Sequence, residues 1–70
     1  MRYNMRTVQY KITDYRNKKT SDYRFLETRD TLKKCAETLG FDVGTEKKGL
    51  NGVKYFYNKK DDTELTIYYV

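Results

Sequence analysis

A chain of 70 residues with one cysteine and no histidine has no covalent or metal staple to hold it folded. Cys35 cannot form an intrachain disulfide, and the set of histidine and cysteine ligands that a structural zinc site needs is missing. Small domains without such staples depend on packing, or on packing combined with oligomerisation. We therefore expect a single domain, residues 1–70, built around one core, and the sequence leaves homodimerisation open.

The N-terminal quarter alternates between apolar and polar residues over positions 5–12, which is typical of a half-buried strand. The apolar positions of this strand are Val8, Tyr10 and Ile12. Residues 13–21 are polar and rich in turn formers, so they favour a loop. Residues 22–27 are ambiguous, because they fit either a second strand paired with the first or the beginning of a helix.

Apolar residues next recur at helical spacing, and the pattern predicts an amphipathic helix over residues 28–39. Its apolar stripe consists of Phe25, Leu32, Cys35, Ala36 and Leu39. Thr28 is the expected N-cap, and Gly40 stands where a left-handed residue usually ends a helix. Phe41 then packs back against the last turn. Since Cys35 lies on the apolar stripe, we expect an inert core thiol rather than a nucleophile.

Three further strands are expected after the helix, as an antiparallel meander. They are residues 41–50, 53–58 and 63–70. The dipeptide Asn51-Gly52 indicates a two-residue type I′ hairpin, which pairs Leu50 with Val53. The predicted fold class is therefore α+β, in the order β(β)αβββ: a small antiparallel sheet with one amphipathic helix packed on one face.

The register of the last hairpin decides which side the tyrosines take. A four-residue turn at 59–62 places Asn58 opposite Thr63. One face then collects Phe56, Leu65, Ile67, Tyr69 and Val43, and suits a helix despite Lys54. The other face collects Leu50, Val53, Tyr55, Tyr57, Tyr68 and Val70, and has no obvious cover.

Three interpretations of the second face compete, and the sequence does not choose among them. Tyrosine has high strand propensity and tolerates water, so the face can be an ordinary solvated one. Tyrosine is also enriched in protein interfaces. Finally, tyrosines surrounded by lysine and arginine form stacking platforms for unpaired bases. Under either of the last two interpretations, the candidate interface or stacking residues are Tyr55, Tyr57 and Tyr68.

The net charge of +5 lies entirely in the first 19 residues, and the remaining 51 are neutral. Such asymmetry is expected of a chain that meets a polyanion, although small domains also carry net charge for solubility. Apart from Asp14, the charged side chains of this segment are all basic. They are the candidate nucleic-acid contacts Arg2, Arg6, Lys11, Arg16, Lys18 and Lys19.

No catalytic or cofactor-binding constellation is visible in the chain. Histidine, the commonest general base, is absent. Asp61, Asp62 and Glu64 lack the glycine and the Asp-x-Asp ligand spacing of a calcium loop, and no phosphate-binding Gly-Lys-Ser/Thr motif occurs. We expect no enzymatic activity, no cofactor and no metal.

The sequence therefore predicts a small, basic, non-enzymatic protein that binds nucleic acid or a nucleic-acid-handling complex. The alternative is a protein-binding inhibitor or adaptor, of the kind phages direct against host enzymes, docking by its sheet edge or tyrosine face. A lone cysteine and the lack of a signal peptide favour the cytoplasm, and no apolar stretch has membrane-spanning length.

Overall fold

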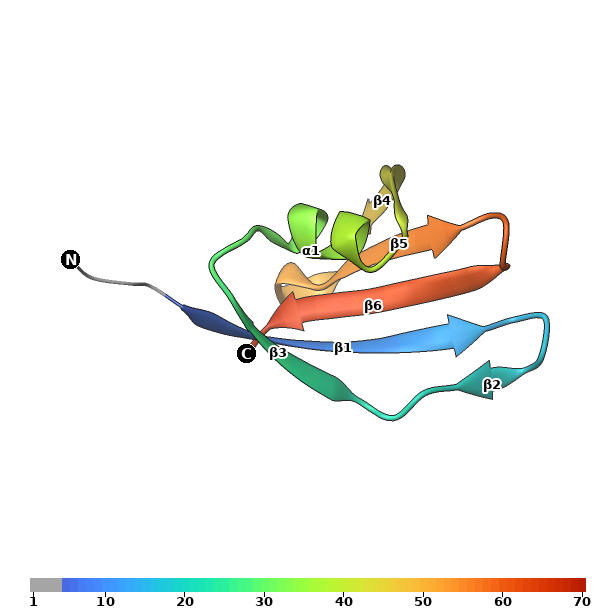
Figure 1. Ribbon diagram of the computed structural model, residues 1–70, viewed down its shortest axis with the longest axis horizontal. Coiled ribbons are helices and arrows are strands. Elements are labelled where there is room, and N and C mark those ends of the chain that lie inside the picture. Colours follow the sequence, from blue (N-terminus) through green and yellow to red (C-terminus); the bar gives the residue numbers. More distant parts are fainter. Residues whose placement is uncertain (1–4) are drawn as a thin grey trace.

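The computed structural model describes residues 5–70, which form a six-stranded antiparallel sheet with one helix packed against it (Figure 1). The strand order is β2-β1-β6-β5-β4, and β3 pairs with β1. The α+β class and the C-terminal meander are thus confirmed. The elements are β1 (Arg6–Asp14), β2 (Lys19–Thr20), β3 (Arg24–Thr28), α1 (Leu32–Thr38), β4 (Asp42–Lys48), the one-turn 3-10 segment η1 (Leu50–Gly52), β5 (Lys54–Asn58) and β6 (Thr63–Tyr69).

The long strand β1 lies between β6 on one side and β2 with β3 on the other. Its predicted inward face is confirmed, because Val8 is fully buried and Tyr10 and Ile12 pack against the core. The strand continues to Asp14, which pairs with Lys19. The expected loop at 13–21 is therefore in part a hairpin.

Residues 22–27, which the sequence left ambiguous, belong mostly to strand β3. Its register with β1 runs without interruption from the pair Arg6 and Thr28 to the pair Tyr10 and Arg24. Phe25 consequently lies in a strand and is 64% exposed. Its assignment to the apolar stripe of the helix was wrong, because pairing with β1 outweighs its helical spacing from Leu32.

The helix α1 is shorter than predicted and spans Leu32–Thr38. Its N-cap is Thr31, whose side-chain oxygen accepts a hydrogen bond from the backbone nitrogen of Lys34 at 3.1 Å. Thr28, the expected cap, lies instead at the end of β3, where its backbone is paired with Arg6. A residue whose backbone is extended and paired in a sheet cannot also begin a helix, so the prediction of Thr28 as the N-cap was wrong.

The C-terminus of α1 has the predicted glycine ending. Gly40 has a φ of +93°, a conformation that glycine adopts without steric cost. Its N–H donates to the carbonyl of Glu37 at 3.0 Å, and the N–H of Phe41 donates to the carbonyl of Ala36 at 2.9 Å. These two bonds make a Schellman motif, and they turn the buried Phe41 back onto the helix.

The hairpin between β5 and β6 has the register that the sequence predicted. Asn58 lies opposite Thr63 and Phe56 lies opposite Leu65, so the charged turn contains four residues. The side chains of Phe56, Leu65 and Ile67 are almost fully buried, and they form part of the core that also includes residues of the helix. The core itself comprises Val8, Leu32, Cys35, Ala36, Phe41, Phe56, Leu65 and Ile67.

The hairpin between β4 and β5 differs from the prediction by one residue. Asn51 and Gly52 do have positive φ angles of 57° and 80°, as a type I′ turn requires. However, the N–H of Gly49 donates to the carbonyl of Val53 at 2.7 Å. The N–H of Val53 still donates to the carbonyl of Leu50 at 3.2 Å, so the predicted pair is half formed: Gly49 and Leu50 share Val53 as a partner, and the side chain of Leu50 is 85% exposed.

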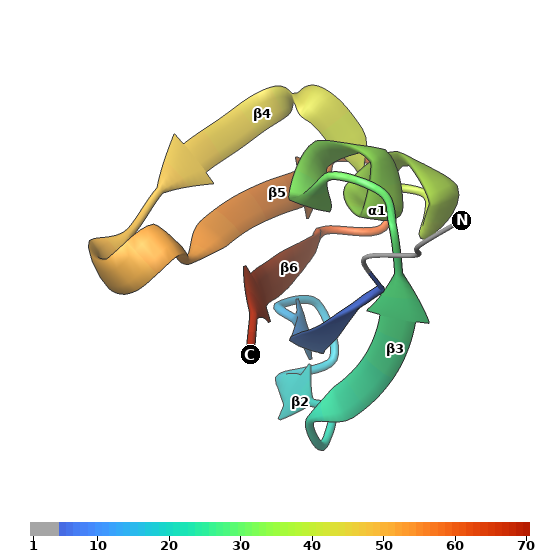
Figure 2. The ribbon, with the colours of Figure 1, turned by 90° about the vertical axis from the view of Figure 1, so that its left-hand side faces the viewer.

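The placement of Cys35 in the core is confirmed, since its side chain is 4% exposed and its sulfur lies 3.8 Å from Oγ1 of Thr28. Figure 2 shows α1 on one side of the sheet. Within residues 5–70, no element covers the other side, which we call the open face.

Candidate binding surface

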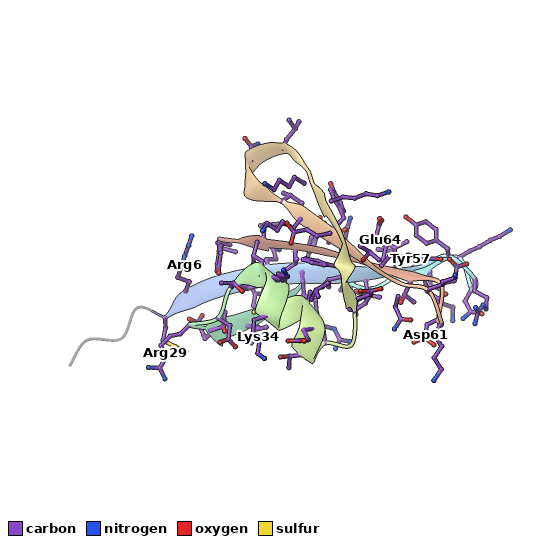
Figure 3. The ribbon with its side chains drawn as sticks, turned by 90° about the horizontal axis from the view of Figure 1, so that it is seen from above. Arg6, Arg29, Lys34, Tyr57, Asp61 and Glu64 are labelled. Atoms are coloured by element: carbon purple, nitrogen blue, oxygen red, sulfur yellow. The ribbon has the colours of Figure 1, made fainter. Side chains whose placement is uncertain are left out.

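The open face carries the three tyrosines that the sequence singled out. Tyr57 lies opposite Glu64 and Tyr55 lies opposite Thr66 in the pairing of β5 with β6. Tyr68 lies opposite a glutamine of β1, Gln9. All three side chains are half-buried. Figure 3 shows Tyr57 and Glu64 on the side of the sheet away from α1.

Hydrogen bonds hold several open-face tyrosines by their hydroxyl groups. Tyr57 donates to the carboxylate of Asp62 at 2.5 Å, and Tyr15, just beyond the end of β1, donates to Glu64 at 2.7 Å. Each of these bonds to a carboxylate raises the pKa of the tyrosine above its ordinary value. Because the hydroxyls are fixed, the rings are preorganised in position on the sheet.

Strand β4 bulges away from β5 and hollows out the open face. Asp42 pairs with Tyr57 and Lys47 pairs with Tyr55, so the register shifts between these two pairs. In the gap, Oγ1 of Thr45 accepts a hydrogen bond from the backbone nitrogen of Tyr57 at 2.7 Å. The resulting hollow has a volume of about 610 Å³. Its lining includes Tyr15, Tyr55, Tyr57, Thr45, Lys47 and Glu64.

The position of the Tyr55 ring depends on Gly49, the residue that directly follows β4. A Cβ atom at Gly49 would lie 2.7 Å from Cε2 of the Tyr55 ring, closer than real Cβ contacts allow. The ring of Tyr55 therefore lies over the backbone of Gly49. Gly49 allows the ring of Tyr55 to approach the backbone closely, a role that the sequence did not indicate for this glycine.

Two turns meet at one end of the sheet and bring cations together. The backbone nitrogen of Tyr15 donates to the carbonyl of Asp62 at 3.1 Å, and the guanidinium of Arg16 donates to the carbonyl of Lys60 at 3.3 Å. Figure 1 shows the β1–β2 and β5–β6 turns at the same end of the molecule. The exposed basic residues of these turns, which we call the turn cluster, are Arg16, Lys18, Lys19, Lys59 and Lys60.

Sequence reasoning missed Lys59 and Lys60 as members of this cluster. In the sequence they precede two aspartates and their charges cancel. Three of the predicted contacts, in contrast, do lie together in the turn cluster: Arg16, Lys18 and Lys19. The signal that joins the two groups is the long-range pairing of β1 with β6, which local patterns do not report.

The other predicted basic contacts lie elsewhere. Arg6 stacks on the ring of Tyr69 on the helix side, with its guanidinium carbon 3.6 Å from the ring centroid. Lys11 lies on the open face, with its ammonium 5.1 Å from the centroid of the Tyr23 ring. Arg2 lies outside the described residues. Figure 3 shows Arg6 and Asp61 toward opposite ends, so the N-terminal charge does not form one patch.

Asp14, an acidic residue beside the turn cluster, is hydrogen-bonded to a neighbouring residue of its own turn. The carboxylate of Asp14 accepts hydrogen bonds from the side chain of Asn17 at 2.8 Å and from its backbone nitrogen at 3.0 Å. These bonds lower the pKa of Asp14 below its ordinary value. They also fix the turn in which Lys18 takes a positive φ of 54°.

Neither a metal cluster nor a membrane-spanning helix is found in the described part of the chain. Within residues 5–70, no three histidine, cysteine, aspartate or glutamate side chains gather as metal ligands do. Over the same residues, no helix has both the length and the apolar character that crossing a bilayer requires. In comparisons with family models, curated proteins and solved structures, none matches this chain.

Proposed function

We propose that this protein binds single-stranded nucleic acid, with bases on the open face and phosphates at the turn cluster. The observation that carries the proposal is the direct junction of the two surfaces. Tyr15 belongs to the same turn as Arg16, and its hydroxyl is bonded to Glu64 on the open face. Positively charged turns beside aromatic rings are the combination that binds unpaired strands.

Near Tyr57, the carboxylates of the open face favour bases over phosphates. The carboxylates of Asp62 and Glu64 accept hydrogen bonds from tyrosines on this face, and they repel a phosphate placed beside them. The turn cluster has five exposed cations, and the carboxylates beside them accept hydrogen bonds within the protein: Asp14 from Asn17, Asp61 from Asn58 and Asp62 from Tyr57. A strand that crosses both surfaces therefore keeps its phosphates at the turns.

The shape of the protein favours unpaired over duplex substrates. Aromatic side chains on a sheet stack with bases only when those bases are unpaired. The one helix described, α1, has only seven residues. The helix packs on one side of the sheet (Figure 2), and the register places the tyrosines on the other. In this proposal the protein is a non-enzymatic cytoplasmic binding protein that needs no cofactor.

The experiment is a titration of fluorescently labelled single-stranded oligonucleotides, in DNA and RNA form, over a series of salt concentrations. The wild type should bind with an affinity that falls with salt. The double variant Lys59→Gln and Lys60→Gln should flatten the log–log salt slope by about 1.4, because each lost phosphate contact on a single strand accounts for roughly 0.7. The triple variant of Arg16, Lys18 and Lys19 to glutamine should flatten it by about 2.

The helix provides a matched control for charge. Lys33 and Lys34 are exposed on α1, which lies on the side of the sheet away from the open face, and their replacement by glutamine changes net charge as much as the Lys59 and Lys60 variant does. That control should leave the slope unchanged. Absence of saturable binding by the wild type, or equal slopes in turn and helix variants, would overturn the proposal.

A second candidate function is docking of a protein partner, and exposed apolar surface at β3 favours it. Phe25, in β3, is 64% exposed, and Tyr23, which directly precedes this strand, is 48% exposed. Phe25 also lines a separate hollow of about 330 Å³ between β3 and α1, with Leu26 and Leu39. Binding that survives high salt and is lost in Phe25→Ser, but not in the turn variants, would support this function instead.

A further inference from the structure

The polar groups that line the hollow on the open face are mostly satisfied within the protein. The hydroxyl of Tyr57 is bonded to Asp62, Oγ1 of Thr45 is bonded to the backbone, and Glu46 pairs with Lys54 at 3.2 Å. These groups have little capacity left for a ligand.

Three groups of the hollow keep capacity for a ligand. Among the described residues, the ammonium of Lys47 and the hydroxyl of Tyr55 form no hydrogen bond or ion pair. The carboxylate of Glu64 accepts one bond at Oε1, from Tyr15, which leaves a second lone pair on Oε1 and both lone pairs on Oε2. The hollow therefore offers free donors on β4 and β5 and a free acceptor on β6.

The sheet register sets these groups on either side of the tyrosines. Lys47 pairs with Tyr55, and Glu64 pairs with Tyr57, so β5 separates the cation from the anion. In a regular sheet adjacent strands lie about 4.8 Å apart, so two strand spacings span about 10 Å, and Lys47 and Glu64 are in addition two residues apart along β5. A flat ligand resting on the two rings thus meets a donor at one edge and an acceptor at the other.

We propose that the hollow takes one unpaired guanine, an assignment that rests on the proposed function and names its base preference. Guanine presents two adjacent acceptors, O6 and N7, at one edge, and two adjacent donors, N1–H and N2–H₂, at the other. Lys47 donates to the acceptor edge, and the carboxylate of Glu64 accepts from the donor edge. The rings of Tyr55 and Tyr57 stack against the face of the base.

The other bases fit this pair of groups less well. Uracil and thymine have one imino donor between two carbonyls, and a carboxylate facing that donor is repelled by both oxygens. Adenine and cytosine offer a single amino group to Glu64, so a bidentate contact with the carboxylate is lost. A good bidentate contact discriminates against a wrong base by roughly 5- to 150-fold.

The test uses single-stranded pyrimidine oligonucleotides of about nine nucleotides, within the range of known single-strand sites. The flanks are thymine in DNA and uracil in RNA. Four probes of each kind differ only in the central base, which is guanine, adenine, cytosine or the base of the flanks. The guanine probe should bind wild type at least about fivefold more tightly than the others. Glu64→Gln and Lys47→Gln should each reduce that preference, while binding of the all-pyrimidine probe changes little.

Matched controls come from the same strands. Lys48 is adjacent to Lys47 and pairs with Lys54, so its side chain lies on the opposite face of the sheet, and Lys48→Gln should keep the preference. Tyr15→Phe removes the hydrogen bond to Glu64 but keeps the carboxylate. Both Tyr15→Phe and Glu64→Gln should lower the thermal midpoint, but only Glu64→Gln should alter the ranking of the probes by affinity.

The outcomes distinguish this inference from the proposed function. If the four probes bind equally and their affinity falls with salt, the guanine site is wrong and single-strand binding stands. If guanine is preferred equally by wild type, Lys47→Gln and Glu64→Gln, the base is recognised outside the hollow and the inference is overturned. If no probe binds, both the function and the guanine site are wrong.

Discussion

The side-chain oxygen of Thr45 lies 2.7 Å from the backbone nitrogen of Tyr57, where a regular strand would supply a backbone carbonyl. The same hydroxyl donates to the carbonyl of Asp42 at 2.6 Å. One side chain thus replaces a rung of the β4–β5 ladder across the register shift. The hollow beside Tyr57 lies at this register shift, and Thr45 is part of its lining.

Replacing Thr45 with valine should destabilise the protein and disturb the hollow. Valine keeps the shape of the side chain but cannot accept from the N–H of Tyr57, and a buried donor left without a partner costs about 1–3 kcal/mol. Denaturant titration measures the loss. Thr45→Ser retains the hydroxyl and should recover most of the stability, so equal losses in the two variants would show that the methyl group matters and the hydrogen bond does not.

Leu32 should matter more to stability than Leu39. The two leucines lie on the same stripe of the sequence, but Leu32 is 5% exposed in the core, whereas Leu39 ends the helix and is half-buried. Leu32→Ala should lower the free energy of unfolding by about 2–5 kcal/mol. Leu39→Ala should lower it by about 1–2 kcal/mol, since less apolar area leaves water there on folding. Equal losses in chemical denaturation would contradict this ranking.

The turn that holds Asp14 predicts a stability change at acid pH. Hydrogen bonds from Asn17 lower the pKa of Asp14 in the folded state, so this group adds stability above its unfolded pKa. That contribution should disappear as the pH falls through the folded pKa. Carbon-13 NMR titration of the carboxyl group should show a pKa below the ordinary aspartate value. In Asn17→Ala the pKa should rise toward that value, and an unchanged pKa in the variant would refute the assignment.

Much of the fold could be predicted because local patterns and local pairing agree. The charged turn at 59–62 has strand residues on both sides, so the register of Phe56 with Leu65 follows from turn length alone. Gly40 and Phe41 likewise lie next to the helix that they terminate. In each case the residues that decide the structure are close in the sequence.

The predictions that failed required information from distant residues. Thr28 and Thr31 are equally good N-caps by local rules, and only the pairing of Thr28 with Arg6 excludes it. Asn51-Gly52 fits a turn with or without an extra residue, so it was not visible that Gly49, and not Leu50, donates to the carbonyl of Val53. For the candidate binding surface, the tyrosine face was predictable, but the meeting of Arg16 with Lys60 was not.

The open-face tyrosines should tolerate truncation better than a core ring would. Tyr57→Ser and Tyr68→Ser each remove one recorded hydrogen bond, to Asp62 and Gln9 respectively, worth about 0.5–1.5 kcal/mol. Affinity for a single-stranded oligonucleotide should fall by about 1–3 kcal/mol per stacking ring lost. Thermal midpoint and affinity are measured on each variant, with Tyr69→Ser on the helix side as the control that should weaken the fold and spare binding. Stable variants with unchanged affinity and oligomeric state would leave the tyrosines as an ordinary solvated face.

The most direct test of single-strand binding by the open face is a two-dimensional ¹H–¹⁵N NMR titration of the whole protein with a single-stranded oligonucleotide. We predict that amide shifts change in β5, β6 and the two turns of the turn cluster, with the largest changes near Tyr55, Tyr57 and Lys60. Amides of α1 should stay in place, because the helix lies on the other side of the sheet. Changes centred on α1 or on Phe25 of β3, or no changes at saturating oligonucleotide, would contradict the account.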